Sequence, residues 1–104
     1  MIDYMHIHAY YRRMEFTCNP KKNEVNLRER SLPLLAARAM FTGEMLVRED
    51  TRRLYPEQRF IGYATLNGRL MVVVFCLPSN EHIHIISFRK ANNREQKKFK
   101  NQKL

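Results

Sequence analysis

The sequence predicts a small α+β domain in which helices pack on an antiparallel sheet. Apolar residues alternate or run together in four segments typical of strands, residues 44–50, 58–66, 69–77 and 82–88. Asn67 and Gly68 separate two of these segments and give the strongest hairpin signal in the chain, because both residues tolerate the positive φ of a type I′ turn. With 104 residues, the chain has the length of one domain with a single core.

The first 13 residues differ in composition from the rest, since they are rich in His, Tyr and Arg. Alternation around His6, Ile7 and His8 suits a strand. We expect residues 1–13 to be an N-terminal extension and residues 14–104 to form the domain, with Met14 as its first residue.

Two helices are predicted after a short strand over residues 14–18. Asn19 followed by Pro20 has the pattern of an N-cap and a first helical residue, and the helix is expected to run to about Arg30. A second helix is expected to open at Pro33, because apolar residues recur at helical spacing up to Phe41. We expect these helices to cover one face of the sheet.

The last strands carry two further signals. Residues 69–77 are apolar on both faces, which predicts a central strand. In the next strand, Ile83 and Ile85 are expected to face the core, with the histidines at 82 and 84 on the opposite face. A C-terminal helix should follow Asn92, an N-cap residue with Glu95 at the capping-box position.

The chain is strongly basic, with a formal net charge of +9. Such a field favours nucleic acid or another polyanion as a partner. From residue 89 onward there is one acid, Glu95, beside seven cations: Arg89, Lys90, Arg94, Lys97, Lys98, Lys100 and Lys103. The polar C-terminal helix is thus either a solvated tail or a helix ordered by a partner that neutralises it.

Other classes of protein and site are disfavoured. The sequence contains neither an apolar run long enough to span a membrane nor a signal peptide, so a cytoplasmic location is expected. Cys18 and Cys76 lack CxxC spacing and read as reduced thiols. With three glycines, no phosphate-binding loop is present, and no cofactor is expected.

Candidate functional residues gather near the end of the last strand. Arg89 and Lys90 lie where sheet-fixed backbone can present them to a phosphate, and Arg59 and Arg69 can reach the same face. His82 and His84 can act as a metal pair, as proton donor and acceptor, or simply as packed side chains. Because no third ligand has suitable spacing, no metal site is expected.

The segment "HIHIISFRKANNRE" resembles the end of BrnT-type toxins of bacterial type II toxin-antitoxin systems. The matching residues are Ile83, Ile85, Ile86, Ser87, Arg89, Ala91 and Glu95. Upstream, "MEFTCNPKKNEVNLRER" is similar to the family's opening, and "EQRFIGYATLNGRLMVVVF" to a family strand that carries Glu, Arg, an aromatic residue and Gly. The resemblance covers about residues 14–99.

The resemblance implies a RelE-like fold and a ribonuclease that halts growth. It also implies a cognate BrnA-type antitoxin with a ribbon-helix-helix part, and binding to operator DNA only through the complex with that antitoxin. Carried over by position, the resemblance implies Arg59 and Arg89 as functional residues. The sequence departs from the family in having Arg30 and Ser31 where His-Gly is usual, and His84 where Arg is usual.

Cleavage without a metal needs a deprotonated 2′-hydroxyl, a stabilised phosphorane and a protonated leaving oxygen. We expect Arg89 and Arg59 to stabilise the phosphate, and His84 or Glu57 to transfer a proton. RNA contacts are expected from Lys90, Arg69, Arg94, Lys97 and Lys98. The alternative is a degenerate toxin, a basic module that binds nucleic acid or a partner without catalysis.

Overall fold

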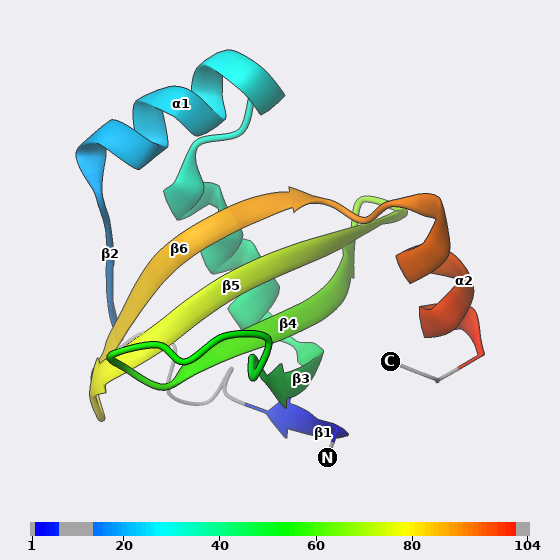
Figure 1. Cartoon of the computed structure of the whole chain (residues 1–104). Helices are drawn as coiled ribbons and strands as arrows, with labels where there is room; N and C mark the ends of the chain where they lie inside the picture. Colours follow the sequence, from blue (N-terminus) through cyan, green and yellow to red (C-terminus); the bar gives the residue numbers. More distant parts are fainter. Residues whose placement is uncertain (1, 7–13, 102–104) are drawn as a thin grey trace.

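The fold is a six-stranded sheet with helices on both of its faces (Figure 1). The computed structural model describes residues 2–6 and 14–101. The strands are β1 (Ile2–His6), β2 (Glu15–Cys18), β3 (Glu44–Glu49), β4 (Arg59–Leu66), β5 (Arg69–Ser79) and β6 (His82–Lys90). Their order across the sheet is β1-β3-β4-β5-β6-β2. The predicted α+β class with an antiparallel meander is therefore confirmed, and β2 joins the meander in parallel with β6.

Both predicted N-terminal helices form. The helix α1 (Pro20–Arg30) begins at Asn19, whose side chain accepts hydrogen bonds from the backbone N–H groups of Lys21 and Lys22. It ends at Ser31, which adopts the left-handed conformation with φ 57°. The second helix, η2 (Leu34–Thr42), is a 3₁₀-helix, and it ends at Gly43 as expected.

The hairpin between β4 and β5 has the predicted geometry. Asn67 and Gly68 have φ values of 50° and 78°, and Leu66 pairs directly with Arg69. The two-residue turn fixes the register, so that every β4 side chain has a defined partner on β5. This register decides which polar residues of β4 and β5 lie side by side on the sheet.

The sheet has an apolar core on each face. On one face, Phe41 of η2 packs with the sheet residues Phe75 and Ile83, and all three have no solvent exposure. On the other face, Ile61, Val72 and their neighbours pack against Ala91 and Phe99, from the segment that leads into and forms α2 (Asn93–Lys100). The C-terminal helix α2 therefore covers the face opposite η2. Strand β5 is buried on both sides, as its sequence predicts.

A bulge bends β6 in its middle. Val74 of β5 pairs with Ser87 and Phe75 pairs with Ile85, so Ile86 is an extra residue in β6. Ile83 and Ile85 face the η2 core as predicted, and after the bulge Phe88 joins the same core. The bulge thereby sets the faces on which Arg89 and the two histidines lie.

The cysteines, the N-terminal segment and the helices each bear on a smaller prediction. Cys18 and Cys76 are free thiols. Strand β1 pairs antiparallel with β3 at one edge of the sheet, while Ile7 and His8 lie outside the described residues. The division of the chain at residue 14 stays a prediction. None of the helices in the described residues has the length and apolar character needed to cross a membrane.

Candidate active site

One row of polar side chains crosses four strands of the sheet. Arg59 of β4 pairs with Cys76 of β5, Cys76 pairs with His84 of β6, and His84 pairs with Thr17 of β2. Directly paired residues share a face, so these four residues line the face opposite η2. We call them the polar row. Two of the predicted catalytic residues, Arg59 and His84, therefore belong to one site.

Glu57 and Tyr55 hold Arg59 at one end of the polar row. The Arg59 Nε donates to Oε1 of Glu57 at 2.7 Å, and its guanidinium lies 4.1 Å from the centre of the Tyr55 ring. Both contacts orient the guanidinium, which is 23% exposed and so accessible to a ligand. The predicted residue Glu57 thus lies at this site, paired with the arginine beside it.

At the other end of the polar row, the Thr17 hydroxyl lies between two histidines. Its Oγ1 is 2.8 Å from Nδ1 of His84 and 2.6 Å from Nε2 of His82. Burial lowers the pKa of His84 below its usual value, and the nearby His82 and Lys22 lower it further, while Glu57 opposes them. His84 is therefore favoured as a neutral imidazole, the form that can accept a proton.

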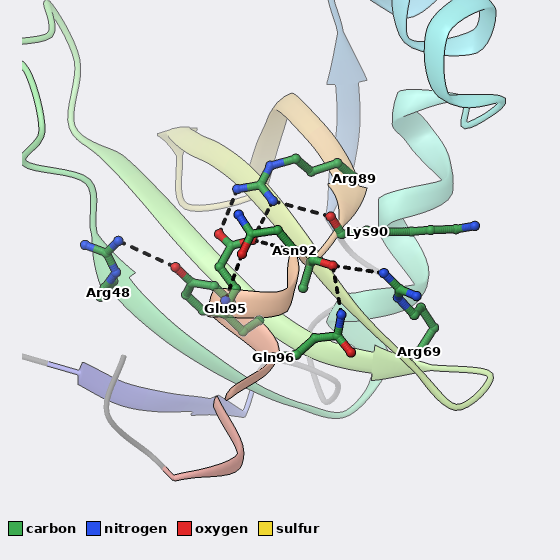
Figure 2. Close-up of polar contacts among 9 residues, drawn as sticks. Arg48, Arg69, Arg89, Lys90, Asn92, Glu95 and Gln96 are labelled. Carbon is green, nitrogen blue, oxygen red and sulfur yellow. Dashed lines mark hydrogen bonds and ion pairs between the residues drawn. The ribbon is translucent and has the colours of Figure 1, made fainter. Parts of the chain in front are cut away.

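Arg89 lies in a second cluster, at the junction of β6 and α2 (Figure 2). It donates from Nη1 and Nη2 to the two carboxylate oxygens of Glu95, at 2.7 and 2.8 Å. This bidentate bond raises the pKa of Arg89 and lowers that of Glu95. Glu95 also accepts from the Asn92 backbone N–H, and Asn92 caps α2 in return, which confirms the predicted capping box.

The remaining predicted contacts surround this junction. Arg69 donates to the Ala91 carbonyl at 2.9 Å, so it holds the chain where β6 ends. Lys90 is exposed, and its side chain extends away from the Arg89–Glu95 pair (Figure 2). Arg94, Lys97 and Lys98 are exposed on α2, and Lys103 lies outside the described residues.

The two predicted phosphate-binding arginines share a face but stand apart. Arg89 pairs with Val72 and Arg59 with Cys76, both on β5 and both directed to the face opposite η2. At roughly 3.3 Å per residue, these partners lie about 13 Å apart along β5. The predicted catalytic set therefore divides between the polar row, with Arg59, His84 and Glu57, and the junction with Arg89.

Sequence reasoning missed several residues that contact or adjoin these sites. Thr17 bridges the two histidines only because β2 runs parallel to β6, and nothing in the local sequence announces that long-range pairing. Arg48 of β3 donates to the Tyr63 hydroxyl at 3.5 Å on the same sheet face (Figure 2). Arg52, held by the buried Asp50, contributes a positive potential at Arg89.

The chemistry available on this face is acid-base and electrostatic. Two oriented guanidinium groups can bind phosphate oxygens, and a neutral imidazole can take a proton from a hydroxyl. Among the residues that the structure describes, no group of three or more His, Cys, Asp or Glu side chains is placed to hold a metal ion. Hollows adjoin the site, one of about 260 Å³ beside Glu57 and Cys76 and another of about 560 Å³ within residues 49–59.

Comparisons with known proteins agree with this fold and with one another. A family model described as the ribonuclease toxin BrnT of the type II toxin-antitoxin system matches residues 19–95. The crystal structure of the ribonuclease toxin BrnT from Brucella abortus is similar, with a TM-score of 0.51 and 17% sequence identity. The match covers 77% of this chain and 99% of the Brucella chain. No curated protein matches the sequence.

Proposed function

The chain belongs to the BrnT family of ribonuclease toxins of type II toxin-antitoxin systems, and from that premise we propose that it cuts RNA without a metal ion on the sheet face opposite η2. The observation that carries the proposal is the polar row, in which an oriented arginine and a neutral histidine flank the small side chain of Cys76.

The spacing of the row suits one RNA phosphate. Two strand spacings of about 4.8 Å separate the backbones of Arg59 and His84, so both side chains can converge on a phosphate placed over Cys76. His84 takes the proton of the 2′-hydroxyl, and Arg59 stabilises the charge that develops on the phosphorane. Glu57 keeps the guanidinium in place.

The junction residues serve the neighbouring nucleotides. The β5 partners of Arg89 and Arg59 lie about 13 Å apart along the strand, and the two arginines stand on opposite sides of β5, so Arg89 suits the next phosphates along the RNA better than the scissile one. Lys90, Arg69, Arg94, Lys97 and Lys98 add positive charge around it. We therefore assign Arg89 to binding and positioning of the RNA, with Arg59 closer to the chemical step.

In the cell, cleavage of this kind halts growth, and a BrnA-type antitoxin with a ribbon-helix-helix part neutralises it. The toxin acts in the cytoplasm and reaches operator DNA only in complex with that antitoxin.

A second candidate function, binding of RNA or a partner without catalysis, is favoured by one observation. Arg59 and Arg89 both already form ion pairs, with Glu57 and Glu95.

Incubation of the purified chain with RNA in EDTA tests the proposal. We expect cleavage products with cyclic-phosphate ends. Arg59→Ala should lower the cleavage rate by about 100-fold, because removal of one oriented donor to the charge of the phosphorane usually lowers the rate by about that factor. Arg28→Ala, an exposed arginine of α1, is the matched control and should cleave as the parent does. Salt-sensitive RNA binding with no cleavage would support the non-catalytic module instead.

A further inference from the structure

The Thr17 hydroxyl joins His82 and His84 into one hydrogen-bonded unit. Both histidines contact the same oxygen, at 2.6 and 2.8 Å, and their rings meet edge to face with centroids 6.4 Å apart. The three residues are partly buried. Each imidazole uses a different nitrogen, Nε2 in His82 and Nδ1 in His84, so Nε2 of His84 has no part in the bond to Thr17.

A hydroxyl carries a single proton, and this restricts the tautomers of the two rings. If Thr17 donates to one ring, its oxygen accepts an N–H from the other. With donation to His82, the proton of His84 lies on Nδ1 and the Nε2 lone pair is free. Both rings then hold their proton on Nδ1, which is the less common tautomer of a free histidine.

The charged groups around His84 favour a neutral ring over an imidazolium. Lys22 of α1 adds positive charge near the ring, and Glu57 acts in the opposite sense from the β3–β4 loop. On β5 the paired residue is Cys76, whose thiol has a raised pKa because of burial and so stays uncharged. On β2, Glu15 pairs with His82, which places a carboxylate beside the outer histidine.

We propose that Thr17 couples the tautomers of His82 and His84, so that Nε2 of His84 is held unprotonated as the base of RNA cleavage. Thr17 and His82 are then positioning residues that act through His84. This inference rests on the proposed function for its catalytic part, whereas the coupling of the tautomers stands on the geometry of the three side chains.

The relay moves the substrate proton away from the reacting phosphate. The 2′-hydroxyl proton passes to Nε2 of His84 as the O2′–P bond forms, and the Nδ1 proton of His84 passes to Thr17. The Thr17 proton moves on to Nε2 of His82. The P–O5′ bond breaks, and O5′ takes a proton from water. The resulting hydroxide takes the Nε2 proton of His84 while a proton returns from Nε2 of His82 through Thr17 to Nδ1 of His84, which restores all three groups.

The coupling is tested by ¹⁵N spectroscopy of the histidines in the full-length chain, made by cell-free synthesis. In the parent we expect protonated Nδ1 and unprotonated Nε2 in both His82 and His84. Thr17→Val keeps the shape of the side chain and removes its hydroxyl, so both rings should return toward the common Nε2–H form. Thr17→Ser should keep the parent signature, as should Thr65→Val, an exposed control in β4.

The catalytic part is tested by cleavage rates of the same four proteins. Thr17→Val should cut RNA about 10- to 100-fold more slowly than the parent, since a well-placed general base contributes 10²–10⁴-fold. We expect the cleavage rate of Thr17→Ser to stay within about 3-fold of the parent rate, because serine keeps the hydroxyl. If Thr17 served only to pack, the rate would not depend on that hydroxyl. Thr65→Val should match the parent rate.

Three outcomes overturn parts of the inference. Protonated Nε2 in His84 of the parent overturns the coupling. Coupled tautomers combined with an unchanged rate in Thr17→Val overturn the relay but leave the proposed function in place. If the parent cuts no RNA, the proposed function and the relay fail together, and the spectra alone then decide whether Thr17 couples the two rings.

Discussion

At the scale of single residues, the candidate site consists of side chains whose positions are fixed by partners. Glu57 orients Arg59 by accepting a hydrogen bond, Glu95 accepts two hydrogen bonds from Arg89, and Thr17 forms a hydrogen bond with His84. Such pairing limits the conformations of long side chains before a ligand arrives, which lowers the entropy cost of binding. Backbone strain is found at Ser31, which ends α1 with a positive φ.

Replacement of Ser31 with Gly should stabilise the protein. The φ of 57° at Ser31 is unfavourable for a residue with a Cβ atom, and Gly adopts it without that penalty. We expect the free energy of unfolding to rise by about 0.5–1 kcal/mol in chemical denaturation. Ser31→Ala, which keeps the Cβ atom, is the control and should give no gain. Equal stability of the two variants would contradict strain at this position.

At the scale of elements, the functional groups depend on how loops and helix ends are locked. Residues 50–58 connect β3 to β4 and present Glu57 to Arg59. Asp50, which is 3% exposed, anchors this loop by accepting bonds from the side chain and backbone of Arg52. At the opposite end of the face, Glu95 joins α2 to β6 through Arg89.

Asp50→Asn should loosen the loop and change the pH dependence of stability. The Arg52 guanidinium lowers the pKa of Asp50 from 3.8 to about 2, so the unfolded chain binds a proton there at higher pH than the native chain does. The pair therefore contributes about 2 kcal/mol above pH 5, and this contribution is lost as the pH falls through 3.8 toward 2.

Unfolding titrations between pH 7 and pH 2 measure this effect. Asp50→Asn should be less stable than the parent at pH 7, and the difference should shrink at the acidic end. Glu49→Gln changes the neighbouring exposed carboxylate and should follow the parent curve. A constant deficit of Asp50→Asn at every pH would show that the ion pair is not its cause.

Glu95 has two roles in α2, and two substitutions separate them. Glu95→Gln keeps a side chain that can complete the capping box but removes the charge that Arg89 binds, whereas Glu95→Ala removes both. Amide hydrogen exchange in α2 should rise slightly in the Gln variant. In the Ala variant we expect protection to fall by about 1 kcal/mol more, the usual worth of a cap. The same exchange in both variants would exclude a role for the capping box.

At the scale of the whole molecule, the charge is distributed unevenly over the two faces and the ends of the chain. The sheet face opposite η2 carries Arg48, Arg59 and Arg89, and α2 adds exposed Lys97 and Lys98 beside them. A basic surface of this kind steers a polyanion toward the site and makes binding sensitive to salt. α2 is held mainly by Phe99 and the Arg89–Glu95 pair, so its lysines remain available.

Neutralising Lys97 and Lys98 together should weaken RNA binding without altering the chemical step. Each lost phosphate contact lowers the slope of log K against log salt by about 0.7 for single strands, so the double Gln variant should lose about 1.4. Fluorescence anisotropy at several salt concentrations measures the slope, and single-turnover cleavage measures the step. Arg28→Gln on α1 is the control. An unchanged slope would place the RNA away from α2.

The sequence alone determined the elements and their ends. Caps at Asn19 and Asn92, the Asn67–Gly68 turn and the alternation of β6 are local signals, and each depends on residues that are neighbours in the chain. The motif around Arg89 and Glu95 was also sufficient to indicate the family to which the chain belongs. The candidate residues Arg59, His84, Glu57 and Arg89 could all be named before the fold was known.

Only the tertiary structure decided which of these residues work together. The hairpin register and the bulge at Ile86 put Arg59 and His84 in one row and leave Arg89 at the far end of the face. The parallel pairing of β2 with β6 brings Thr17 to His84, although 67 positions separate them in the chain. Contacts of this range depend on the packing of the whole sheet, so no local pattern of residues can specify them.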